Sequence, residues 1–82
     1  MDRVYKLDIS NKSITSVPSL KSFNKLRYLR LDFNRIRCIE NLECLPDLRE
    51  LHLQNNEISE IEGLKGNKCL TVLNLATNYI EV

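Results

Sequence analysis

Residues 26–47 read LRYLRLDFNRIRCIENLECLPD, and the spacing of their apolar residues decides the fold. Leu29-Arg30-Leu31 alternates apolar and polar residues, which is the period of a short β-strand with both leucines facing inward. Beyond this strand, apolar residues recur every three positions: Ile36, Ile39, Leu42 and Leu45. A spacing of three suits 3₁₀ turns or an extended arc, whereas an α-helix would alternate spacings of three and four. The stretch therefore predicts a strand, a turn and a loosely wound return.

The same pattern recurs every 22 residues along the whole chain, without insertion or deletion. The strand columns are Leu7, Leu29, Leu51 and Leu73, followed by Ile9, Leu31, Leu53 and Leu75. The return columns are Ile14, Ile36, Ile58 and Ile80, then Val17, Ile39 and Ile61, then Leu20, Leu42 and Leu64. One unit cannot bury its own apolar face, so the units must stack into a solenoid. We predict a single domain over residues 1–82, with units at 4–25, 26–47 and 48–69 and a partial unit at 70–82. Parallel strands are expected at 28–31, 50–53 and 72–75.

An asparagine column follows the strands at Asn34, Asn56 and Asn78. An amide side chain there can bond the backbone groups that the turn leaves unpaired, so we interpret this column as structural. Lys12 occupies the same column in the first unit, where we expect Asn11 to take over the bonding. Asn67 stands where the other units carry an apolar residue.

These motifs resemble the leucine-rich-repeat family, and within it the 22-residue subclass typified by a regulatory subunit of protein phosphatase-1. The pattern LxxLxLxxNxIxxIxxLxxLxx stands complete at residues 26–47, and the resemblance covers essentially the whole chain. It implies an α/β solenoid, wound as a right-handed arc. A parallel β-sheet should form its concave face and short 3₁₀ or extended turns its convex face. It also implies a non-catalytic scaffold or adaptor that binds a protein partner, such as a phosphatase or a cytoskeletal or ciliary protein.

Candidate binding residues follow from the alternation within each strand, which turns every second side chain out of the core. The outward positions are Lys6, Asp8 and Ser10, then Tyr28, Arg30 and Asp32, then Glu50, His52 and Gln54, then Val72, Asn74 and Ala76. Tyr and Arg dominate interface energetics, and exposed rings are otherwise costly. We predict a protein-binding site formed by Tyr28, Arg30, Phe33, Glu50, His52 and Gln54, although Phe33 could instead tuck against its turn.

We expect no enzyme activity, cofactor or metal site, because the repeat places no nucleophile or metal ligand beside His52, the single histidine. Cys38, Cys44 and Cys69 fall on the return arc, where we expect small, half-buried fillers. Three sparse cysteines suit a reducing compartment, and no secretory signal precedes the first unit. We therefore expect an intracellular protein, cytoplasmic or nuclear, without a membrane segment.

Charge is uneven along a chain whose net charge is only +1. Residues 1–37 hold nine Lys or Arg against three Asp or Glu, a balance of +6, and residues 38–64 hold one against seven, a balance of −6. The basic second repeat, with Arg27, Arg30, Arg35 and Arg37, favours an alternative reading as a site for RNA or a ribonucleoprotein. The acidic stretch that follows, and the absence of an RNA-binding motif, make nucleic acid the weaker expectation.

The C-terminal end of the predicted solenoid carries Leu70, Leu73, Leu75 and Ile80 with no further unit to cover them. Terminal units need a polar outer face to stay soluble. We therefore expect this end to be covered in one of three ways: by further units of a longer protein, by a partner, or by self-association of two copies.

Overall fold

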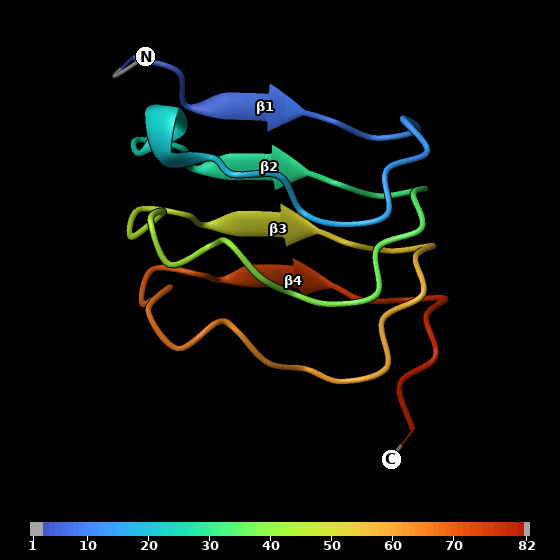
Figure 1. The fold of residues 1–82 in the computed structure, drawn as a ribbon. Helices are drawn as coiled ribbons and strands as arrows, with labels where there is room; N and C mark the ends of the chain where they lie inside the picture. Colours follow the sequence, from blue (N-terminus) through green and yellow to red (C-terminus); the bar gives the residue numbers. More distant parts are fainter. Residues whose placement is uncertain (1–2, 82) are drawn as a thin grey trace.

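Four short parallel strands form one sheet in the computed structural model, which describes residues 3–81. They are β1 (Lys6–Asp8), β2 (Tyr28–Arg30), β3 (Glu50–His52) and β4 (Val72–Asn74). Strands that follow each other in the sequence lie side by side in the sheet (Figure 1), and every paired position differs by 22 residues, as in Leu7↔Leu29 and Leu29↔Leu51. The predicted strands are confirmed, each ending one residue earlier than expected.

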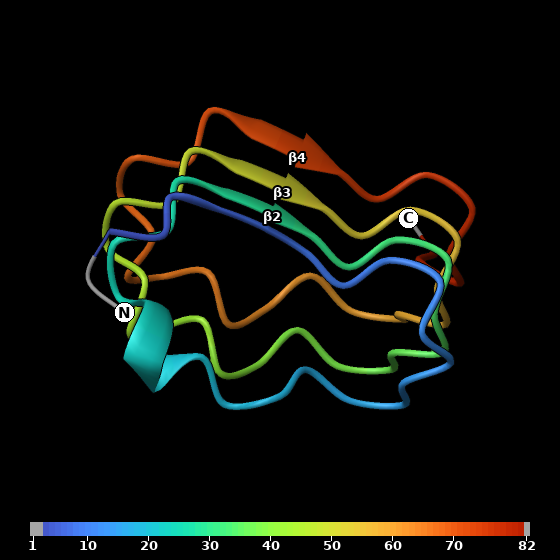
Figure 2. The ribbon, with the colours of Figure 1, turned by 90° about the horizontal axis from the view of Figure 1, so that it is seen from above.

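The return segments form a second layer opposite the sheet (Figure 2). The first return contains one short 3₁₀ helix, η1 (Lys21–Phe23), and the other returns are turns and bends without a helix in the described residues. The spacing of three in the sequence explains this, because such a pattern cannot present a continuous apolar stripe on an α-helix. The predicted solenoid is therefore confirmed.

The core lies between these two layers and consists of the repeated apolar columns. Strand residues Leu29, Leu31, Leu51 and Leu53 are fully buried, as are Ile36, Ile58 and Leu42 from the returns. Burying one such side chain contributes roughly 1.5–3 kcal/mol relative to leaving it exposed. The two middle units hold most of this core, because each has a neighbouring unit on both sides.

The asparagine column ties each unit to the one before it. Asn56 Nδ2 donates to the carbonyls of Leu31 and Leu53, at 3.0 Å each, and its Oδ1 accepts the Ile36 N–H at 3.0 Å. Asn78 repeats this arrangement one unit later, with Leu53, Leu75 and Ile58. The structural role predicted for this column is confirmed, and the bonds cross between units because a turn alone cannot pair its own buried groups.

The first turn is satisfied differently from our expectation. Asn34 Oδ1 accepts the Ile14 N–H at 3.2 Å, as Asn56 does with Ile36, and it also accepts the Lys12 N–H at 2.9 Å. The expectation for Asn11 was wrong, because its side chain makes no hydrogen bond within residues 3–81, and its backbone N–H donates to the Asp32 carbonyl just as Phe33 and Asn55 donate to the units that follow them. Asn67, the other departure, is buried and donates to the carbonyls of Leu42 and Leu45.

The unit around β4 is less covered than the others. Leu73 is 37% exposed, although the equivalent Leu51 is fully buried. Ile61, which the repeat places in a core column, is 60% exposed, whereas its counterpart Ile39 is 3% exposed. The core position expected for Ile61 was therefore wrong, because this column is buried by the unit that follows and no described residues occupy that place.

Candidate functional site

The outer face of the sheet, turned away from the core, carries a different side chain on every strand. One column runs Lys6, Tyr28, Glu50 and Val72, and the next runs Asp8, Arg30, His52 and Asn74. Neighbouring strands lie about 4.8 Å apart, so each column presents four distinct groups at a regular interval. We call this surface the concave face. Of the predicted site residues, it brings together Tyr28, Arg30, Glu50 and His52.

Arg30 is held by two carboxylates. Its Nε and Nη2 donate to Asp32 Oδ1 at 3.1 Å and Oδ2 at 2.8 Å, and its Nη1 lies 3.7 Å from Asp8 Oδ2. Asp32 is completely buried, so the expectation that it faces outward was wrong. The alternation holds only within a strand, and β2 ends at Arg30, so Asp32 lies in the turn beneath the guanidinium. Sequence analysis missed this pair.

Asp8 and Arg30 each stabilise the charged form of the other. The pKa of Asp8 lies below its ordinary value, mainly because the Ser10 hydroxyl and backbone N–H donate to its carboxylate, and Arg30 and Lys12 add to the effect. The pKa of Arg30 is raised, first by its hydrogen bonds to Asp32 and then by the negative charges of Asp32 and Asp8. Both groups therefore remain ionised at neutral pH, and the guanidinium keeps a fixed orientation.

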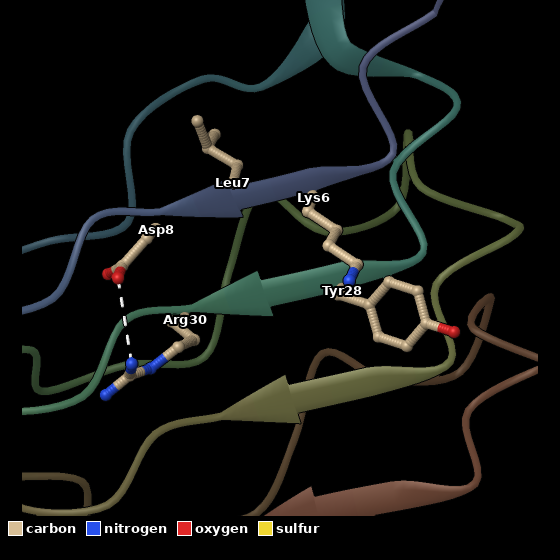
Figure 3. A pocket seen from close by; sticks show the side chains of 5 residues that line it. All are labelled: Lys6, Leu7, Asp8, Tyr28 and Arg30. Carbon is tan, nitrogen blue, oxygen red and sulfur yellow. Dashed lines mark ion pairs between the residues drawn. The ribbon is translucent and has the colours of Figure 1, made fainter.

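A hollow of about 270 Å³ lies over β1 and β2 on the concave face, lined by Lys6, Leu7, Asp8, Tyr28 and Arg30. Figure 3 shows Lys6 and Tyr28 at one end of it, and Asp8 with Arg30 at the other. The Lys6 ammonium lies 5.2 Å from the centre of the Tyr28 ring, a cation–π contact that positions the lysine. The hollow therefore lies between a cation–π pair at one end and an ion pair at the other.

The third strand contributes a polar pair. His52 Nε2 lies 3.4 Å from Glu50 Oε1, and both side chains are partly exposed. Gln54, the third predicted residue from this unit, lies past the end of β3, is half-buried and has its Oε1 covered without a hydrogen-bond partner. Glu50 and His52 are therefore available to a partner on the concave face, while Gln54 borders that face from the turn.

Phe33 lies in the turn after β2, where its backbone N–H donates to the carbonyl of Gln54, another predicted residue, at 3.0 Å. The Phe33 side chain is 53% exposed, so the ring is only partly tucked against the protein. Its backbone has φ 55°, in the left-handed region that bulky residues disfavour. The same position in the other units holds Asn11, Asn55 and Thr77, with similar φ angles. The repeat, not the phenylalanine, imposes this conformation.

The arginines of the basic second repeat do not gather on one surface. Arg30 is bound to Asp32 on the concave face, while Arg27 lies over the Tyr5 ring at 4.7 Å. Arg35 and Arg37 line a separate hollow of about 440 Å³ with Thr15 and Glu57, and the Arg37 Nε lies 3.3 Å from the Glu57 carboxylate. Positive charges close in sequence are thus separated in space and partly neutralised.

Residues 3–81 hold few other side chains of the kinds that react or bind metal ions. Cys38 and Cys69 are exposed and Cys44 is half-buried, so the expectation of half-buried fillers holds only for Cys44. No three His, Cys, Asp or Glu side chains of the described chain are grouped for metal binding. Within the same residues, no helix has the length and apolar character needed to span a membrane.

Comparison with family models identifies the class of protein. The model described as "Leucine rich repeat" matches residues 2–58, and the model "Leucine Rich repeats (2 copies)" matches residues 46–81. A comparison with curated proteins finds no significant match. The chain therefore belongs to the leucine-rich-repeat family, whose members are generally non-catalytic modules that bind other proteins.

Proposed function

We propose that the chain is a scaffold or adaptor that binds a protein partner through its concave face. The observation that supports this proposal is the difference between the inward and the outward side chains of each strand. The inward columns repeat the same leucines, while the outward columns differ on every strand and include Tyr28, Arg30, Glu50 and His52. Uniform inward residues satisfy stacking, whereas a varied outward face can be specific for one partner.

The finer assignments rest on the sequence pattern. We propose that the chain belongs to the 22-residue subclass typified by the phosphatase-1 regulatory subunit, since its spacing never varies and its described returns contain only one short 3₁₀ helix. On that basis the partner is a phosphatase or a cytoskeletal or ciliary protein, and the protein works inside the cell. Nucleic acid is disfavoured, because Arg27, Arg30, Arg35 and Arg37 are dispersed and three of them contact described side chains.

A pull-down with matched baits tests the concave face. The variant Tyr28→Ala/His52→Ala removes two outward side chains without leaving Asp32 unpaired, and Lys21→Ala/Glu43→Ala changes two exposed residues of the returns as a control. We expect specific partners to be lost with the first bait and kept with the second. Equal recovery by all baits, with each variant folded by circular dichroism, would refute the concave face as the binding surface.

We also propose self-association at the apolar end of the solenoid. Of the four residues expected there, Leu73 is exposed and Leu70, Leu75 and Ile80 are half-buried, while Ile61, Val72 and Tyr79 of the same two units are exposed. Contact with a second copy would cover these side chains, and the gain would depend little on salt. Light scattering over a concentration series tests this: the mean mass should rise with concentration, and less so for Ile61→Gln. A constant monomer mass at high concentration would contradict it.

A further inference from the structure

The turns that follow the four strands stack on one another and form an edge of the solenoid (Figure 1). Two ladders of backbone hydrogen bonds run along this edge. In the first, the Phe33 N–H donates to the Gln54 carbonyl at 3.0 Å, and in the second, the Arg35 N–H donates to the Ile14 carbonyl at 2.9 Å. Equivalent bonds in the other units start from the N–H groups of Asn11, Asn55, Glu57 and Tyr79. The ladders therefore hold equivalent residues of successive units side by side.

We call this surface the turn edge. It consists of two columns, Asn11, Phe33, Asn55 and Thr77 in one and Ser13, Arg35, Glu57 and Tyr79 in the other.

Phe33 is the exception in its column. Its side chain is 53% exposed, so much of the ring lacks the stabilisation that burial gives. Its φ of 55° lies in the left-handed region, where a bulky residue is an outlier. The other three units fill this position with the small polar residues Asn11, Asn55 and Thr77. Since three of the four units fold without a ring here, the repeat does not require the phenylalanine.

The neighbours of Phe33 leave its ring accessible. Asn11 and Asn55, on either side of it in the column, have shorter side chains, of which the first is exposed and the second half-buried. Arg35, in the adjacent column of the same unit, is also exposed. The ring is thus an isolated apolar group in polar surroundings, and strain and exposure at one residue together point to a use outside the fold.

The turn edge lies within reach of a partner bound to the concave face. Phe33 follows Arg30 by three residues, so their Cα atoms are at most about 11 Å apart. A protein that covers the outward side chains of β2 therefore reaches Phe33 without a second, separate docking site.

We propose that the turn edge is a further contact surface for the protein partner, and that Phe33 inserts its ring into an apolar pocket of that partner. Aromatic side chains are enriched in protein interfaces, and burial in such a pocket supplies the apolar contact that the free chain lacks. The inference rests on the proposed function and adds an anchor residue outside the sheet.

A single ring among polar neighbours favours a protein pocket over a membrane or RNA. Membrane-surface binding draws on a broad apolar face, whereas both neighbours of Phe33 in its column are asparagines. Binding of single-stranded RNA combines base stacking with a positively charged groove, whereas Glu57 lies 3.3 Å from Arg37 and neutralises part of the charge on this edge.

Affinity measurements with the full chain test the proposal. The protein that the wild-type bait recovers in the pull-down is purified and titrated against immobilised wild type and variants. Phe33→Asn should weaken binding by about five- to thirtyfold, the range from a significant contact to a hot spot. Ile61→Gln removes a similarly exposed apolar side chain from a return and should leave the affinity unchanged. The urea midpoint of Phe33→Asn should not fall, because asparagine tolerates the left-handed backbone.

An unchanged affinity of Phe33→Asn, an equal loss with Ile61→Gln, or a lower urea midpoint of Phe33→Asn would each overturn the proposal. If Phe33→Asn binds normally while Tyr28→Ala/His52→Ala loses the partner, the concave face stands and only the turn edge fails. If the wild-type bait recovers no protein, both fail. Phe33-dependent sedimentation with phosphatidylserine vesicles, or a Phe33-dependent shift of single-stranded RNA, in place of protein binding would assign the ring to a membrane or to RNA and overturn the protein pocket.

Discussion

The Arg30 guanidinium lies on the outer face of the sheet and donates two hydrogen bonds, of 3.1 and 2.8 Å, to the fully buried carboxylate of Asp32. The arginine is thereby a structural residue as well as a candidate contact. A buried carboxylate that loses its partner retains the full cost of leaving water. Substitution of Arg30 alone therefore confounds binding with stability.

Arg30→Ala should lower the free energy of unfolding, because the fully buried Asp32 carboxylate loses both of its hydrogen bonds to the guanidinium. The double variant Arg30→Ala/Asp32→Ala should lose less than the single variant, since the unpaired charge is removed too. Urea unfolding followed by circular dichroism measures both values, with Lys25→Ala as the exposed control. A double variant that is less stable than Arg30→Ala would contradict this relationship.

Asn56→Ala should lower the free energy of unfolding by about 3 kcal/mol, because the Asn56 amide makes three hydrogen bonds of about 1 kcal/mol each and shares one of its N–H groups with the Gln54 carbonyl at 3.4 Å. Asn78 makes the same four contacts in a half-buried setting. Water can replace part of the hydrogen bonding that Asn78→Ala removes. The free energy of unfolding should therefore fall clearly less in that variant than in Asn56→Ala. If urea titrations show an equal loss of unfolding free energy for both variants, burial does not determine how much these asparagine hydrogen bonds contribute to stability.

Gly63→Ala should destabilise the chain by about 2 kcal/mol or more. Gly63 has φ 73°, and a Cβ built on it would clash with the backbone carbonyl of Ile39, which belongs to the neighbouring unit. Gly66, three residues later, has open space around it, and Gly66→Ala should be tolerated. Thermal unfolding of both variants makes the comparison. A tolerated Gly63→Ala would mean that the two units separate without cost.

Phe33→Asn should raise the free energy of unfolding by about 0.5–1 kcal/mol, because asparagine accepts the left-handed backbone that costs phenylalanine about 1–2 kcal/mol. The reverse change, Asn55→Phe, places the ring at the same position of the next unit, where φ is 60°, and should destabilise. Chemical unfolding of the two variants is the measurement. If Phe33→Asn lowers stability, the covered part of the ring outweighs the backbone strain.

The periodic features of the fold were predictable from the sequence, because stacking repeats one set of contacts every 22 residues. Strand register, the leucine columns and the asparagine column all follow from that repetition. The burial of Asp32 was not predictable, since the alternation stops where β2 ends and the sequence does not mark that residue. The role of Asn34 in the first turn also escaped prediction, because its hydrogen bonds cross to another unit.

The candidate site was predictable as a set of outward positions, but its internal contacts were not. Alternation placed Tyr28, Arg30, Glu50 and His52 on one face, as observed. It gave no sign that Lys6 packs over Tyr28, because a cation–π contact depends on rotamers and not on spacing. The dispersal of Arg35 and Arg37 from Arg30 likewise follows from the turn after β2, which carries the chain off the sheet.

Photo-crosslinking from single positions tests the central claim, binding of a protein by the concave face, most directly. Benzoylphenylalanine in place of Tyr28 puts the reactive group on that face, and the same residue in place of Glu43 puts it on the exposed surface of a return. On irradiation in cells, we expect a discrete protein adduct from position 28 and none from position 43. An adduct from position 43 alone, or identical adducts from both, would contradict the account.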